Sequence, residues 1–84
     1  MIYTIEYAKA FPWKVLEKIP KDDLQRIQNA IEQKLTKEPL LFGKPLRHSL
    51  KGSRRLRVGD YRVIYTIKKT TVTIALIGNR STVY

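Results

Sequence analysis

The sequence predicts an α+β domain with the element order β-α-α-β-β-β, in which an N-terminal helical hairpin packs on one face of a mainly antiparallel sheet. Three patterns support this prediction. The chain begins with a strand-like alternation, continues with apolar residues at helical spacing, and ends with strand-like runs separated by two tight turns. Eighty-four residues suit one small domain, so we expect a single domain over residues 1–84.

The N-terminal half predicts one strand and two short helices. Residues 2–7 alternate in the manner of a strand with one buried face. A first helix is expected to begin at Pro12 and to end at Pro20, since proline fits the first turn of a helix but breaks its interior. A second helix should follow and end at Pro39. Its apolar stripe consists of Leu24, Ile27, Ile31 and Leu35.

Residues 51–67 predict the β-hairpin around which the sheet is organised. Gly59-Asp60 fits a two-residue turn of type I′ or II′, because glycine adopts positive φ without steric cost. This turn places Arg57 opposite Arg62. One face of the hairpin then collects Leu56, Val58, Tyr61, Val63 and Tyr65, and the other collects Arg55, Arg57 and Arg62. Like charges that face each other cost stability, so the arginine cluster suggests an anionic partner.

One further strand, over 72–77, is expected after this hairpin. Residues 46–50 could also form a short strand before it. Simple alternation in the last strand places Leu76 beside Val63, on the core face, and leaves Ile77 beside Arg62.

The net charge of +10 lies almost wholly in the second half of the chain. Residues 1–43 carry a net charge of +1, and residues 44–84 carry +9. Such an imbalance predicts a polyanionic partner. The basic residues fall on expected strands rather than on an amphipathic helix, so a membrane is the least favoured partner. Without cysteines, a signal-peptide pattern or a long apolar run, the chain is expected to be cytoplasmic.

The chemically active residue types are arginine, tyrosine, lysine and one histidine, His48. The acids show no metal-ligand spacing and there is no glycine-rich phosphate loop, so we expect no metal and no cofactor. Arginine stabilises phosphoryl charge and an aromatic ring can stack a base. This set of residues suits metal-free cleavage of RNA by attack of the 2′-OH.

The run PLRHSLKGSRRLRVGDYRVIYTI, followed by IGNR and a terminal VY, resembles the RelE/ParE superfamily of bacterial and archaeal toxins. The preceding helical hairpin fits as well, so the resemblance covers essentially the whole chain. RelE-like members are ribosome-dependent endoribonucleases that cut mRNA in the A site, whereas ParE-like members poison DNA gyrase. The resemblance also implies a small, acidic, partly disordered antitoxin, through which the toxin–antitoxin complex would bind operator DNA.

The resemblance also implies which residues form the site. Arg62 would stabilise charge on the phosphate, and Arg80 would contact the phosphate or the leaving group. Tyr84 would stack on the substrate or orient it, and Arg55 lies where these toxins often place a residue that assists 2′-OH activation. Further phosphate contacts are expected from Arg47, Lys51, Arg54 and Arg57.

The identity of the general base stays open. A lysine that some RelE toxins have upstream is replaced here by Ser53. Arg55 is a poor base because the pKa of arginine lies above 12. The alternatives are His48, Lys51, or no side chain at all, with electrostatics alone driving the reaction. We therefore expect an mRNA-cleaving toxin acting on the ribosome, with a ParE-like gyrase poison without nuclease activity as the alternative.

Overall fold

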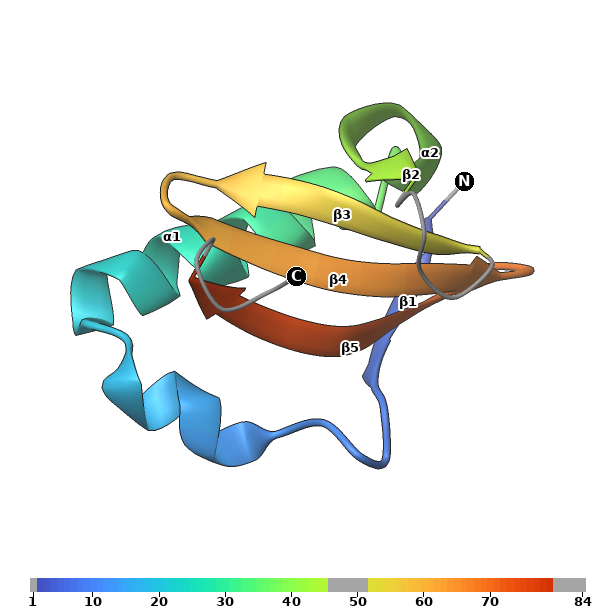
Figure 1. Cartoon of the computed structure of the whole chain (residues 1–84). Helices are drawn as coiled ribbons and strands as arrows, with labels where there is room; N and C mark the ends of the chain where they lie inside the picture. The colour runs from blue at the N-terminus through green and yellow to red at the C-terminus, as the bar shows by residue number, and fades with distance from the viewer. Residues whose placement is uncertain (1, 46–51, 80–84) are drawn as a thin grey trace.

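The computed structural model of the protein describes residues 2–45 and 52–79 and contains one five-stranded sheet in the order β1-β5-β4-β3-β2 (Figure 1). The strands are β1 (Thr4–Tyr7), β2 (Lys44–Pro45), β3 (Ser53–Val58), β4 (Tyr61–Lys68) and β5 (Thr71–Asn79). β1 pairs in parallel with β5, and every other neighbouring pair is antiparallel. The α+β class and the mainly antiparallel sheet are therefore confirmed.

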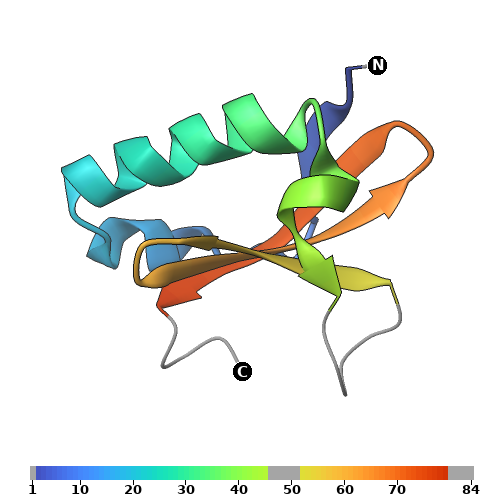
Figure 2. The same cartoon turned by 90° about the horizontal axis from the view of Figure 1, so that it is seen from above.

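Helical elements cover one face of this sheet. They are the 3₁₀ helix η1 (Trp13–Lys18), α1 (Lys21–Ala30), the π-helical segment η2 (Ile31–Leu35) and the short helix α2 (Pro39–Phe42). α1 runs behind the sheet in Figure 1, and Figure 2 shows it on one side of the strands. The opposite sheet face carries no helix among the described residues.

The second predicted helix forms as α1 and η2. Pro20 precedes its first turn and accepts a hydrogen bond from the backbone of Leu24 at 2.9 Å. The predicted apolar stripe faces the sheet, since Ile27, Ile31 and Leu35 are almost fully buried. Burial of this stripe is what holds the helical layer to the strands.

The expectations for the two flanking helices need correction. The first helix is the 3₁₀ helix η1, in which Ile19 N donates to Leu16 O at 3.2 Å, because the two bounding prolines leave room for fewer than two α-helical turns. Pro39 does not end the second helix. It occupies the first turn of α2, where a proline loses no hydrogen bond. The predicted strand over 46–50 lies outside the described residues.

The hairpin register is as predicted. Val58 pairs with Tyr61 and Arg57 with Arg62, around a turn in which Gly59 has a φ of +60°. The predicted core face is buried most completely at Leu56, Val63 and Tyr65. These side chains form one core with the stripe of the helices.

The pairing of β4 with β5 departs from simple alternation. The register shifts between Ile64 and Tyr65, so β5 contains an extra residue at this point. Ile77, rather than Leu76, therefore lies opposite Val63 and is buried in the core. The predicted neighbour of Arg62 was also wrong, because Gly78 lies opposite it.

Candidate nucleic-acid interface

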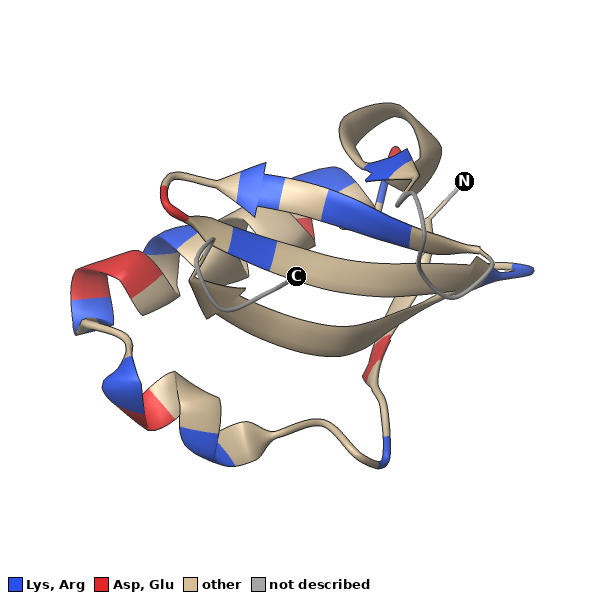
Figure 3. Ribbon diagram, viewed as in Figure 1, with Lys and Arg blue, Asp and Glu red and all other residues tan. Residues whose placement is uncertain are grey.

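Four basic residues share the sheet face that lies opposite the helices, and we call this surface the basic sheet face. Arg57 pairs with Arg62 across β3 and β4, and Lys44 pairs with Arg55 across β2 and β3. Residues directly opposite each other in neighbouring strands project from the same face. The basic sheet face thus consists of Lys44, Arg55, Arg57 and Arg62. Figure 3 shows their segments side by side on β2, β3 and β4.

The hairpin holds two of these cations close together on a rigid support. Antiparallel partners have Cβ atoms only about 4.5–5.5 Å apart, so the side chains of Arg57 and Arg62 start from adjacent positions. Arg57 is exposed, and its Nε donates to the carbonyl oxygen of Gly59 at 3.2 Å. Arg62 is partly buried. A guanidinium that starts from a sheet is better positioned than one on a loop.

Acidic residues are sparse around this surface. Strands β3, β4 and β5 contain no Asp or Glu. Glu6 of β1 pairs with Thr73 of β5 and so shares the face, but β5 separates it from the arginines of β4 and β3. The potential over the centre of the face is therefore set by cations and favours an anion.

Gly78 is a feature of this face that the sequence analysis missed. It lies opposite Arg62 and is buried. Glycine places no side chain directly opposite the arginine in β5. The sequence signal was the IGNR run, whose glycine lies directly after the strand predicted over 72–77.

Lys44 was missed as well, because it lies in a two-residue strand next to a proline. Proline is tolerated in edge strands, where its missing N–H breaks no ladder. Pro45 was therefore compatible with an edge strand at this position, which would have placed Lys44 at the edge of the sheet. It adds a fourth cation to the three arginines expected on this face.

The tip of the hairpin is fixed to the helical layer. Tyr61 Oη donates to Asp23 Oδ2 at 3.2 Å, and Asp23 also lies 3.7 Å from Arg26 in an ion pair. Burial, and then the nearby Asp23 carboxylate, raise the pKa of Tyr61. A polar pocket of about 290 Å³ lies here, between the turn and α1. Because Tyr61 precedes Arg62, this contact helps to fix the backbone position from which the Arg62 side chain extends.

Arg54 lies away from the other predicted cations. Alternation along β3 places it on the helix side of the sheet. Its Nη2 donates to the carbonyl oxygens of Leu40 at 2.9 Å and Gly43 at 2.7 Å. The phosphate contact predicted for Arg54 stays a prediction, and the structure gives this side chain a role in holding α2.

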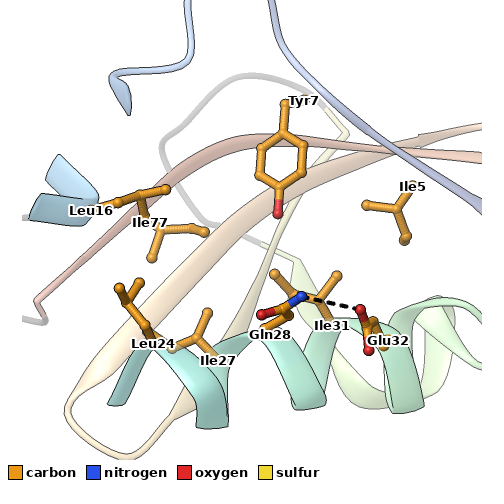
Figure 4. A pocket seen from close by; sticks show the side chains of 9 residues that line it. All are labelled: Ile5, Tyr7, Leu16, Leu24, Ile27, Gln28, Ile31, Glu32 and Ile77. Atoms are coloured by element: carbon orange, nitrogen blue, oxygen red, sulfur yellow. Dashed lines mark hydrogen bonds between the residues drawn. The ribbon is translucent and has the colours of Figure 1, made fainter. Parts of the chain in front are cut away.

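An apolar groove of about 470 Å³ lies between α1 and the β1–β5 edge of the sheet. Tyr7, Ile77, Leu24 and Ile27 line it together with residues of η1 and η2, as Figure 4 shows. Burial, and then the Glu32 carboxylate, raise the pKa of Tyr7. Tyr7 also belongs to an aromatic cluster, with its ring 5.0 Å from those of Phe11 and Trp13.

The remaining predicted site residues lie outside the described part of the chain. They are Arg47, His48, Lys51, Arg80 and Tyr84. Their roles stay predictions. The structure brings together Arg55, Arg57 and Arg62 of the predicted set, adds Lys44, and separates Arg54 from them.

The described residues contain neither a metal-binding cluster nor a membrane-spanning helix. Within 2–45 and 52–79, no three His, Cys, Asp or Glu side chains gather in a way that could hold a metal ion. No helix in the same ranges is both long and apolar enough to span a membrane.

Comparison with known proteins identifies the family. A family model described as "ParE toxin of type II toxin-antitoxin system, parDE" matches residues 6–84. The chain belongs to the RelE/ParE toxin superfamily. It is therefore a toxin of a type II toxin–antitoxin system. Toxin RelG of Mycobacterium tuberculosis is 35% identical to this toxin over 86 residues, covering 100% of this chain and 98% of the relative.

Solved structures of related toxins share the fold. The toxin–antitoxin complex RelBE2 from Mycobacterium tuberculosis contains a chain that matches with a TM-score of 0.84 and 34% identity, over 96% of this chain and 94% of the other. The RelB–RelE complex from Methanococcus jannaschii matches with a TM-score of 0.71 and 25% identity, over 94% of each chain. The predicted RelE-like fold is therefore confirmed.

Proposed function

We propose that this toxin is a ribosome-dependent endoribonuclease that cleaves mRNA in the ribosomal A site and so stops translation. The observation that supports this most directly is the pairing of Arg57 with Arg62 on the sheet face opposite the helices. Like charges on directly opposite residues of neighbouring strands repel each other. They become favourable when a phosphate lies between or above them, because guanidinium groups bind phosphate through charge-assisted hydrogen bonds.

The proposed reaction uses the RNA's own nucleophile. The 2′-OH attacks the adjacent phosphorus, the P–O5′ bond breaks, and the products are a 2′,3′-cyclic phosphate and a 5′-OH. Negative charge develops on the phosphoryl oxygens, where Arg62 and Arg80 would stabilise it. Arg55 and Arg57 would position the phosphate, and Lys44 extends the cationic surface toward the sheet edge.

The remaining steps belong to residues whose roles are predicted from the resemblance. Tyr84 would stack on a base and hold the in-line geometry. The proton of the 2′-OH would pass to His48, to Lys51 or to solvent. Arg47 and Lys51 would add phosphate contacts. This function requires ribosomes and mRNA as partners and a cytoplasmic location.

A cognate antitoxin is part of the same proposal. The related RelBE2 and RelB–RelE proteins were solved as toxin–antitoxin complexes. With a net charge of +10, the toxin suits a small, acidic antitoxin. The resemblance implies that the antitoxin is partly disordered alone and that it binds operator DNA within the complex.

The chemistry of the cut ends tests the proposal. Translating ribosomes would be incubated with the purified toxin, and the mRNA fragments recovered. Downstream fragments with a 5′-OH accept phosphate from polynucleotide kinase without phosphatase treatment, and this is the expected result. Fragments with a 5′-phosphate would contradict attack by the 2′-OH.

A second candidate function is poisoning of DNA gyrase. The observation that favours it is the description of the matching family model as a ParE toxin. Such a toxin would bind gyrase and would need no nuclease site. A gyrase cleavage assay separates the two functions, since a ParE-like toxin would produce DNA breaks and leave translated mRNA intact.

A further inference from the structure

The short helix α2 presents consecutive large apolar side chains to solvent. Leu40 is 63% exposed, Leu41 71% and Phe42 43%. The described residues include six exposed large apolar side chains, and half of them lie in this single turn. Isolated exposed apolar residues are ordinary on a protein surface, but a contiguous group commonly marks an interaction site.

The backbone of this turn is held by hydrogen bonds from side chains of the sheet. Arg54 Nη2 donates to Leu40 O at 2.9 Å and to Gly43 O at 2.7 Å. Tyr65, which is fully buried, donates its hydroxyl to Pro39 O at 2.6 Å. Both ends of α2 are thus tied to strands β3 and β4, so its exposed side chains do not result from a loose segment.

Close packing at Gly43 reinforces this attachment. A Cβ added at Gly43 would lie 2.6 Å from Tyr65 Cζ and closer still to its hydroxyl oxygen. The chain therefore needs a residue without a side chain there. Because this backbone is already ordered, a partner that binds α2 does not have to order it, and such pre-organisation favours affinity.

The charges around α2 indicate the chemistry of the partner. Lys34 Nζ lies 5.4 Å from the ring centroid of Phe42. Lys37 precedes α2 and Lys44 follows it, whereas Glu38 is the one acid between residues 34 and 44. A second copy of the toxin would bring another net charge of +10 to this surface, so a carboxylate-bearing partner is favoured.

We propose that α2 is a docking site for an acidic amphipathic helix of the antitoxin, with Leu40, Leu41 and Phe42 as its apolar anchors. The proposal rests on the antitoxin partner given under the proposed function. Leucines at i, i+3, i+4 and i+7 of the partner helix would cover the anchors. Carboxylates beside these leucines would approach Lys34, Lys37 and Lys44.

A labelled probe peptide tests this docking site. The probe is a fluorescent peptide of about 16 residues, long enough to form a helix, with leucine at these spacings and glutamate at most other positions. Binding to the full toxin is followed by fluorescence anisotropy. A second probe with glutamine in place of glutamate tests the contribution of charge.

Paired variants locate the binding. Leu40→Gln with Leu41→Gln removes two anchors, and Trp13→Gln removes an exposed apolar side chain from η1, away from α2 in both views (Figures 1 and 2). We expect the double variant to bind the acidic probe about tenfold more weakly or worse. We expect the Trp13 variant to bind within about twofold of the parent toxin, and the glutamine probe to bind more weakly than the acidic one. Circular dichroism checks that the variants are folded.

Several results would overturn the proposal. They are failure of the acidic probe to bind the parent toxin, equal binding by the double variant, and equal loss in the Trp13 variant. Sedimentation that shows a dimer dissociated by the double substitution would assign α2 to self-association instead. The mRNA cleavage assay is run on the same proteins, and the double variant should retain cleavage. A parent toxin that binds the probe but cleaves no mRNA would refute the nuclease function alone.

Discussion

Arg57 of β3 and Arg62 of β4 are direct partners across the central hairpin, on the sheet face that lies opposite the helices. This arrangement places two like charges directly opposite each other on a rigid hairpin. The proposed function accounts for this pair, because an RNA phosphate bound between the two guanidinium groups would replace their repulsion with attraction. The toxin would therefore gain stability if the repulsion were removed and would lose activity by the same change.

Replacing Arg57 by glutamine should test whether removing the repulsion stabilises the toxin. Arg57→Gln keeps a long polar side chain but removes the like charge opposite Arg62. It also removes the exposed hydrogen bond from Arg57 Nε to Gly59 O, which water can replace. We therefore expect the free energy of unfolding to rise by about 0.2–1 kcal/mol. Urea denaturation at low salt measures the change. The gain should shrink at high salt, where screening already weakens the repulsion. A gain that is independent of salt would show that charge is not its cause.

Replacing Arg62 by alanine should test whether the pair is needed for cleavage. The loss of a donor to the developing phosphoryl charge is expected to reduce the cleavage rate by about two orders of magnitude or more. Single-turnover cleavage of mRNA on programmed ribosomes measures the rate. Lys14→Ala, which removes an exposed cation from η1, is the matched control and should leave the rate unchanged. Full activity of Arg62→Ala would refute the site assignment.

Gly43→Ala should destabilise the toxin by about 1–3 kcal/mol, the usual cost of overpacking. Gly43 has a φ of −97°, which any residue adopts, so the cost would come from overlap with Tyr65 and not from the backbone. Thermal unfolding measures the effect. Leu41→Ala, an exposed site in the same segment, should change stability by about 0.5 kcal/mol or less.

Tyr65→Phe should cost about 1–3 kcal/mol, because the buried carbonyl oxygen of Pro39 would lose its donor. Burial raises the pKa of Tyr65, although the hydrogen bond and charge of Arg54 act in the opposite direction. The unfolded state therefore ionises first, and the stability that the neutral phenol provides is lost as pH rises above about 10. Denaturation curves should show a steeper loss between pH 9 and about pH 11 in the parent toxin than in Tyr65→Phe. Equal slopes would contradict this explanation.

The hairpin was predictable because its determinants are local. Gly59 fixes the turn, and a two-residue turn fixes which side chains meet. The position of Arg57 opposite Arg62 followed directly from the sequence. The buried stripe of α1 and η2 was predictable for a similar reason, since helical periodicity is visible within a single segment.

The features that were missed depend on contacts between distant parts of the chain. The extra residue in β5 opposite Ile64 and Tyr65 brings Ile77 into the core, and no alternation pattern within β5 reveals it. α2 is stabilised by Arg54 and Tyr65, which come from strands later in the chain. Pro39 alone fits either the end of one helix or the start of the next.

The most direct test of the account compares translated with naked mRNA. Purified toxin would be added to a reconstituted translation reaction and to the same message without ribosomes, and the mRNA ends mapped by primer extension. We predict cleavage only in the translated sample, at a fixed offset from the stalled ribosome. Cleavage of both samples would contradict ribosome dependence, and an intact message in both would contradict the nuclease function.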